Sequence, residues 1–218
     1  MMKTVAINGS PKTKDSASGI FIDQIENILE APLTVYQATQ LIQRQDITET
    51  LSDILRADVL LFIFPLYVDS LPAPLIKVLT LIEQTGTNGF APKVYAVCNC
   101  GFYEAEHTRP ALDIVRNFCD CAGLAWGYGI GIGGGGFVSS RGGNMSKGPT
   151  ANVYSALREL GEVMQQGKVE KQNVFVRPKI PRFLYKLGGN FSWYLGWCQM
   201  AIKHGVGHSL WARPHVRE

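Results

Sequence analysis

The chain has 218 residues, 46% of them hydrophobic and 18% charged, which is the composition of a folded protein with one substantial core. Its 21 basic and 18 acidic residues give a net charge of +3, too small to indicate nucleic-acid binding. No signal-peptide pattern, no apolar run of the ~18 residues that a membrane span needs and no disulfide framework are present. We therefore expect a cytoplasmic protein.

Five strand-like apolar runs alternate with helical patterns over about residues 2–165. The runs are Lys3–Gly9, Leu33–Ala38, Asp58–Pro65, Lys93–Cys100 and Leu124–Gly134. The third run is apolar without alternation, as in a central parallel strand that is covered on both faces. Helical patterns occupy residues 17–30, 48–57, 73–86, 109–123 and 151–167. This alternation predicts an α/β fold, a three-layer sandwich around a five-stranded parallel sheet.

The first run is followed by a polar loop, "NGSPKTKDSASG" (Asn8–Gly19). It contains hydroxyl groups and positive charges just before a predicted helix, on Ser10, Lys12, Thr13, Lys14, Ser16 and Ser18. Such a loop suits a phosphate, because hydroxyls, lysines and a helix N-terminus all favour an anion. A polar loop with a serine N-cap is the plainer interpretation. The loop matches neither the Walker pattern nor the dinucleotide glycine pattern.

Two further loops follow the third and fourth runs. "PLYVDSLPAP" (Pro65–Pro74) is rich in proline and leaves the most apolar run, and "NCGFYEAEH" (Asn99–His107) contains a glycine that permits close backbone approach. Ligands of parallel α/β sheets bind at the carboxyl ends of the strands, where these loops lie. Glu104 and His107 are the titratable side chains of the last loop, and we expect both at the surface.

Together, "GSPK…S", "PLYVDSLPAPL" and "NCGFYE" resemble the flavodoxin-like superfamily of NAD(P)H-dependent FMN reductases and quinone reductases. The resemblance covers about residues 2–165 and implies a flavodoxin-like fold, FMN as cofactor, and NADPH or NADH as electron donor. In that superfamily the first loop holds the FMN phosphate, the second lies beside the isoalloxazine ring, and the third closes its other side. Lys12 stands where the superfamily often has arginine.

The resemblance implies a set of cofactor-binding residues in the three loops. They are Ser10, Lys12, Ser16, Ala17 and Ser18 on the phosphate side, Pro65, Leu66, Tyr67, Val68 and Asp69 beside the ring, and Asn99, Cys100, Gly101, Phe102 and Tyr103 opposite. No side chain is expected to be catalytic, because flavin carries the redox chemistry and the protein supplies binding and orientation.

Four of the five cysteines form two Cys-x-Cys pairs, Cys98/Cys100 and Cys119/Cys121. Their spacing matches neither a zinc site nor an iron–sulfur cluster, so we expect no metal and favour buried, packed thiols. His204, His208 and His215 lie in a glycine-interrupted basic segment, and we do not expect them to bind a metal either.

The tail from Lys168 to Glu218 contains nine basic residues against two glutamates, and three of the four tryptophans. A linker around Arg177–Pro181 precedes one or two helices, with a possible break at Gly188–Gly189. Trp193 and Trp197 are four residues apart and share a helix face. Packing across a homodimer or homotetramer is the favoured role, ahead of a lid over the flavin or contact with a membrane surface.

We therefore expect a flavodoxin-like FMN-binding domain over residues 1–167 and a basic, aromatic helical extension over residues 168–218. The predicted activity is hydride transfer from a nicotinamide, through FMN, to a quinone, a flavin or another small acceptor. Two alternatives stay open: an electron-transfer flavoprotein without nicotinamide activity, and a protein whose tail binds a membrane or a partner.

Overall fold

The computed structural model describes residues 2–12, 16–87, 89–141, 145–169 and 172–207. By its internal contacts the chain divides into two compact units, Met1–Lys179 and Ile180–Glu218. The first unit contains the whole sheet, and the described part of the second is built around a single long helix.

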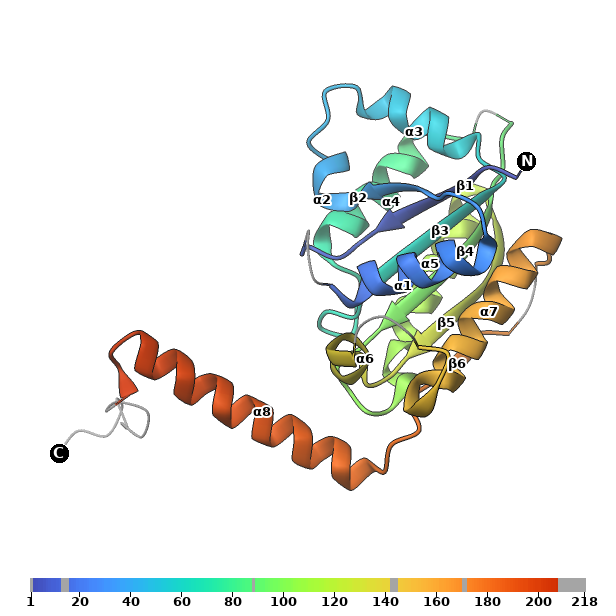
Figure 1. Cartoon of the computed structure of the whole chain (residues 1–218). Coiled ribbons are helices and arrows are strands. Elements are labelled where there is room, and N and C mark those ends of the chain that lie inside the picture. The colour runs from blue at the N-terminus through green and yellow to red at the C-terminus, as the bar shows by residue number, and fades with distance from the viewer. Residues whose placement is uncertain (1, 13–15, 88, 142–144, 170–171, 208–218) are drawn as a thin grey trace. The chain divides into compact units, whose positions relative to one another are not determined.

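The first unit is a parallel six-stranded sheet with helices on both faces (Figure 1). The strands are ordered β2-β1-β3-β4-β5-β6 and comprise Thr34–Gln37 (β2), Thr4–Asn8 (β1), Val59–Pro65 (β3), Lys93–Asn99 (β4), Ala125–Ile132 (β5) and Val174–Val176 (β6). The first five follow the flavodoxin-like order, and each matches a strand expected from the sequence. The α/β class and the parallel sheet are confirmed.

The prediction of five strands is wrong by one, because β6 adds a sixth at the edge of the sheet. It pairs in parallel with β5, Ile130 opposite Val174 and Ile132 opposite Val176. Three residues between polar neighbours are too short for a periodicity to show, so sequence reasoning assigned them to the extension. The segment up to Lys179 belongs to the sheet-containing unit.

Five described helices of the first unit match the helical patterns expected from the sequence, and two shorter ones, α2 (Ala38–Leu41) and α6 (Gly135–Arg141), were not expected. The five are α1 (Ala17–Leu29), α3 (Ile47–Leu55), α4 (Ala73–Thr85), α5 (Arg109–Ala122) and α7 (Ala151–Gln166), with short 3₁₀ turns at Ala105–Thr108 and Gly148–Thr150. Gly123 ends α5 in the left-handed conformation, at φ 68°, as a C-terminal glycine cap does.

The sheet separates two hydrophobic cores, and alternate residues of β3 point into one core or the other. Leu60, Phe62 and Phe64 belong to the core that includes residues of α2, α3, α4 and α5. Leu61 and Ile63, on the opposite face, belong to the core that includes α1 and α7. Because both faces are covered, β3 is apolar throughout, as its sequence predicted.

The second unit contains α8 (Arg182–Lys203), a single helix that continues through Gly188 and Gly189. The sequence left open whether a break occurs at these glycines, and the structure shows none. Among the described residues, no helix combines the length and apolar character required to cross a bilayer.

We expect a chain that ends after Lys179 to be more stable than one that ends after Gly167. The shorter chain loses β6 and two buried contacts: the carbonyl of Lys168 that accepts from the Tyr95 hydroxyl (2.6 Å), and the Asn173 amide oxygen that accepts from Gly129 N–H (2.8 Å). Unpaired buried donors cost about 1–3 kcal/mol each, so thermal unfolding of the shorter chain should begin at least ~5 °C lower. Equal melting temperatures would contradict this role of β6.

Candidate flavin site

The three predicted ligand loops leave the same edge of the sheet. β1 and β3 are neighbours, with Asn8 opposite Ile63, while their chain connections lead to opposite sides. This is the switch point where α/β sheets form a crevice for ligands. The ends of β3 and β4 are also adjacent, with Pro65 opposite Asn99. The structure therefore brings the loops together as the sequence predicted.

The first loop is ordered at both ends by its own serines. Asn8 Oδ1 accepts from Ser10 N–H (2.9 Å), and Ser10 Oγ accepts from Lys12 N–H (3.2 Å). Ser16 is the N-cap of α1, and its Oγ accepts from Gly19 N–H (3.1 Å). A hydroxyl that accepts one bond keeps its own proton for donation. Ser10 and Ser16 are thus organised donors beside the start of a helix.

The remaining phosphate-side residues differ in accessibility. Lys12 is exposed and supplies charge, Ala17 begins α1, and Ser18 is buried, with only 1% of its surface accessible. Burial makes Ser18 the least accessible to an incoming phosphate. Thr13 and Lys14 lie outside the described residues.

The second loop contains a tight turn with unusual backbone geometry. Tyr67 and Ser70 exchange two backbone hydrogen bonds (2.9 and 3.0 Å), and Val68 and Asp69 between them have φ of 49° and 55°. A β-branched residue at positive φ is strained, and such strain gathers at functional sites. Leu66 N–H donates to the Asn99 carbonyl (2.7 Å), which ties the second loop to the third. Val68 is 98% exposed at the tip of the turn.

The third loop rests on the glycine tract that follows β5. Gly134 N–H donates to the Phe102 carbonyl (2.6 Å), and Gly135 N–H donates to the Cys100 carbonyl (2.8 Å). The backbones approach so closely that a Cβ on Gly133 would lie 2.5 Å from the Tyr103 carbonyl oxygen. The glycine tract therefore positions this loop.

Asn99 gives the site a buried polar atom without a hydrogen-bond partner. Its side chain is 6% exposed, and Oδ1 has no hydrogen-bond partner among the residues the structure describes. An unpaired buried amide oxygen costs free energy unless something donates to it. Asn99 therefore fits a ligand that brings an N–H group to the end of β4, which a flavin ring does.

Arg177 is a charged neighbour of the third loop that the sequence did not reveal. Its guanidinium lies 4.8 Å from the centre of the Tyr103 ring, a cation–π distance. Phe102 packs against the ring of His107, with centroids 4.5 Å apart and the ring planes tilted by 40°, and remains half exposed. Arg177 directly follows β6, so missing that strand also concealed this arginine.

Three buried cysteines are kept as protonated thiols, Cys98 and Cys100 at the end of β4 and Cys119 in the C-terminal part of α5. Burial raises the pKa of Cys100 and raises that of Cys98 further, and it raises the pKa of Cys119 to about 12. Neutral thiols are weak nucleophiles and weak metal ligands. Within the described ranges, no three His, Cys, Asp or Glu side chains gather as a metal site would require.

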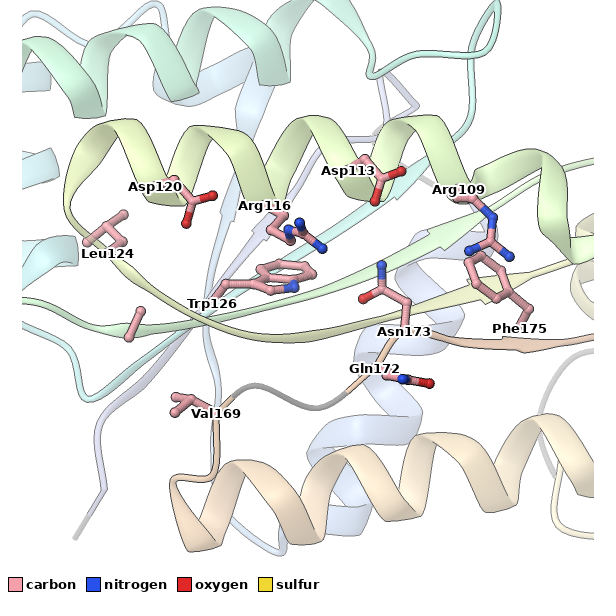
Figure 2. Close-up of a pocket in the computed structure, with 11 residues that line it drawn as sticks. Arg109, Asp113, Arg116, Asp120, Leu124, Trp126, Val169, Gln172, Asn173 and Phe175 are labelled. Carbon is pink, nitrogen blue, oxygen red and sulfur yellow. The ribbon is translucent and has the colours of Figure 1, made fainter.

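A separate groove of about 940 Å³ lies beside α5 and the outer strands (Figure 2). Arg109, Asp113, Arg116 and Asp120 of α5 line it, together with Trp126 of β5 and Asn173 just before β6. None of the three loops contributes to its lining, so this groove is distinct from the candidate flavin site.

Solved structures similar to this chain include two described as oxidoreductases or reductases and one protein in complex with FMN. An NADH:FMN oxidoreductase in its apo form matches with a TM-score of 0.58 and 15% identity, over 78% of this chain and 92% of its own. A general stress protein of Treponema denticola in complex with FMN matches with a TM-score of 0.51 and 12% identity, over 73% of this chain and 99% of its own. No family model matches the chain, and no curated protein matches its sequence.

A third solved structure, an NADPH-quinone reductase from P. pentosaceus, matches with a TM-score of 0.53 and 15% identity, over 73% of this chain and 98% of its own. At these sequence identities the similarity concerns the fold alone. It agrees with the strand order of the sheet around the β1/β3 switch point. The chain therefore shares the fold of these structures, and this is the flavodoxin-like fold expected from the sequence.

Proposed function

We propose that the protein is an FMN-dependent oxidoreductase that takes hydride from NADPH or NADH and reduces a quinone, a flavin or another small acceptor. The observation that carries the proposal is that three loops begin together at the switch point, beside a buried Asn99 oxygen that has no hydrogen-bond partner in the described part of the chain. The solved structures of similar fold that are described as NADPH-quinone and NADH:FMN oxidoreductases support it.

The residues present fit FMN at both ends. The first loop offers the hydroxyls of Ser10 and Ser16 and the charge of Lys12 beside a helix N-terminus, which suits a phosphate. Asn99 Oδ1 is an acceptor for a ring N–H, and the exposed rings of Tyr67 and Phe102 offer apolar surface to a flat ligand.

FMN, when bound, supplies the acceptance and release of hydride, while the protein binds and orients the reactants. The described loops contribute hydrogen bonds and shape. The thiol of the third loop, Cys100, donates to the carbonyls of Phe102 (3.7 Å) and Glu104 (3.6 Å) and thus helps to hold that loop. The chain therefore orients reactants without a covalent step of its own.

The proposal is tested on the purified full-length chain in three measurements. We expect flavin absorbance bands, a melting temperature that rises with added FMN, and oxidation of NADPH or NADH that depends on a quinone. FMN binding without nicotinamide oxidation would identify the electron-transfer alternative. No thermal shift at saturating FMN would overturn the proposal.

Replacing Ser16 with aspartate should separate phosphate binding from helix capping. Aspartate caps a helix as well as serine does, so the melting temperature of the FMN-free protein should stay within about 2 °C of wild type. Its negative charge faces the phosphate, so FMN affinity, measured by fluorescence titration, should fall by about tenfold or more. Ser16→Asn, an uncharged cap, is the matched control and should bind FMN far better than Ser16→Asp. Similar affinities for both would show that the loop holds no phosphate.

A further inference from the structure

Helix α8 has one apolar face along its whole length. Leucine, isoleucine, aromatic and cysteine side chains recur at three- and four-residue spacing, as Leu184, Leu187, Phe191, Leu195, Cys198 and Ile202. The other side of the helix carries its basic residues, Arg182, Lys186 and Lys203, together with two apolar residues, Trp197 and Met200. No other helix or strand of the described residues 180–207 covers the apolar face within its own unit.

The helix needs a partner to be stable. The helix contains Gly188, Gly189 and Gly196, and each costs about 1 kcal/mol relative to alanine. An isolated helix of such a sequence is marginal in water, and most of its stability has to come from burial of its apolar face. The occupant of that face therefore determines whether α8 is formed.

The charge of the segment around α8 indicates what kind of partner covers its apolar face. The 47 residues from Lys171 to Arg217 contain eight Lys or Arg and no Asp or Glu. Residues 180–218 contain five basic residues and one acidic residue, a net charge of +4. Residues 1–179 contain 16 basic and 17 acidic residues, a net charge of −1. The whole positive excess of the protein thus lies in the unit that contains α8.

This charge disfavours a second copy of the chain as the occupant. Two copies of α8 packed side by side bring like charges together, without an acidic residue on either helix to pair with them. The sheet-containing unit of another copy is close to neutral and offers little attraction to a unit of +4.

We propose that α8 binds the surface of an anionic lipid bilayer, lying in the headgroup region with its apolar face toward the acyl chains. Basic side chains at both ends of the helix, Arg182 and Lys186 at the start and Lys203 at the end, meet the anionic headgroups. Phe183 and Tyr194 flank the apolar face, and aromatic rings favour this depth. The protein is thereby held at the membrane by a helix that lies on it.

The test uses the full-length protein and vesicles of phosphatidylcholine with or without phosphatidylglycerol, in a co-sedimentation assay. We expect binding to the anionic vesicles to be about tenfold tighter than to the neutral ones and to weaken as salt is added. Equal binding to both vesicle types, or no binding to either, would overturn the proposal.

Two neighbouring substitutions place the same charge on the apolar face and beside it, because consecutive residues of a helix point about 100° apart. Phe191→Glu and Ser192→Glu each add one negative charge, but only the first places it on the apolar face. Phe191→Glu should weaken vesicle binding by about tenfold more than Ser192→Glu. Equal effects would show that charge alone acts and would contradict insertion of the apolar face.

Light scattering on the same variants separates the competing occupant. If the protein does not bind vesicles but forms an oligomer, and Phe191→Glu dissociates that oligomer while Ser192→Glu does not, the apolar face binds a second copy of the chain. FMN affinity should be the same in the wild type and both variants, because the three flavin loops lie in the other unit. A failure of the proposed flavin chemistry therefore leaves this test unaffected.

Discussion

Replacing Gly133 with alanine should weaken FMN binding and lower stability together. The added Cβ would lie 2.5 Å from the Tyr103 carbonyl oxygen and 2.9 Å from Ala105 N, and both are backbone atoms. Neither is the end of a flexible side chain, so the third loop itself has to move. Overpacking of this kind costs about 1–3 kcal/mol, and displacement of a binding loop adds a loss of affinity of about tenfold or more.

Gly136→Ala is the control for this substitution, since it lies in the same glycine tract. A Cβ there would meet nothing within 4 Å, and the residue belongs to α6. Alanine should leave FMN affinity unchanged and stabilise the helix by up to about 1 kcal/mol. Thermal melting and FMN titration of the two variants give the comparison. If Gly133→Ala bound FMN like Gly136→Ala, the third loop would have no part in the site.

Replacing Gly127 with alanine should cost the most stability while sparing the flavin site. Its Cβ would contact Cε1 of Tyr95 and lie 2.6 Å from Cδ1 and 2.7 Å from Cζ of that ring. Tyr95 is fully buried, packs edge-on against Tyr128, and its hydroxyl donates to the Lys168 carbonyl, so the ring has little room to shift. We expect a loss of about 3 kcal/mol, which corresponds to a melting temperature lower by about 6–12 °C.

Chemical denaturation of a double variant shows whether the ring is the cause. In a Tyr95→Leu background the alanine at position 127 gains room, so Gly127→Ala should cost much less there than in the wild type. FMN affinity of folded Gly127→Ala protein should be close to wild type, because Gly127 lies near the amino end of β5, away from the loops. Additive costs in the double variant would place the strain elsewhere.

The sequence predicts the fold correctly where apolar runs mark buried strands and where proline or glycine marks the ends of helices. β3 is an unbroken apolar run, and Pro74 near the start of α4 and Gly123 after α5 mark helix boundaries by their backbone preferences. The three loops were likewise predictable, because each begins where an apolar run stops. Their meeting follows from parallel topology, which places all carboxyl ends on one edge.

Other features depend on contacts that no local pattern contains. β6 is a strand because β5 offers it an open edge, and three residues show no period of their own. The cation–π contact of Arg177 with Tyr103 joins positions 74 residues apart. The role of the glycine tract depends on the backbone of the third loop pressing against it, which a count of glycines cannot reveal. Tertiary packing, and not propensity, determines each of these.

The position of β6 also bears on how the chain folds as it is synthesised. From β3 onward the strands are added in chain order, so each new strand docks on an edge that the previous one has just formed. Domains generally fold as units, with the N-terminal part first during synthesis, and this topology allows strands to be added to the sheet one after another as the chain leaves the ribosome. The edge of β5 stays open until Val174–Val176 emerges, and open edges invite aggregation. Since α8 is translated only after β6, its apolar face appears when that vulnerable edge is already closed.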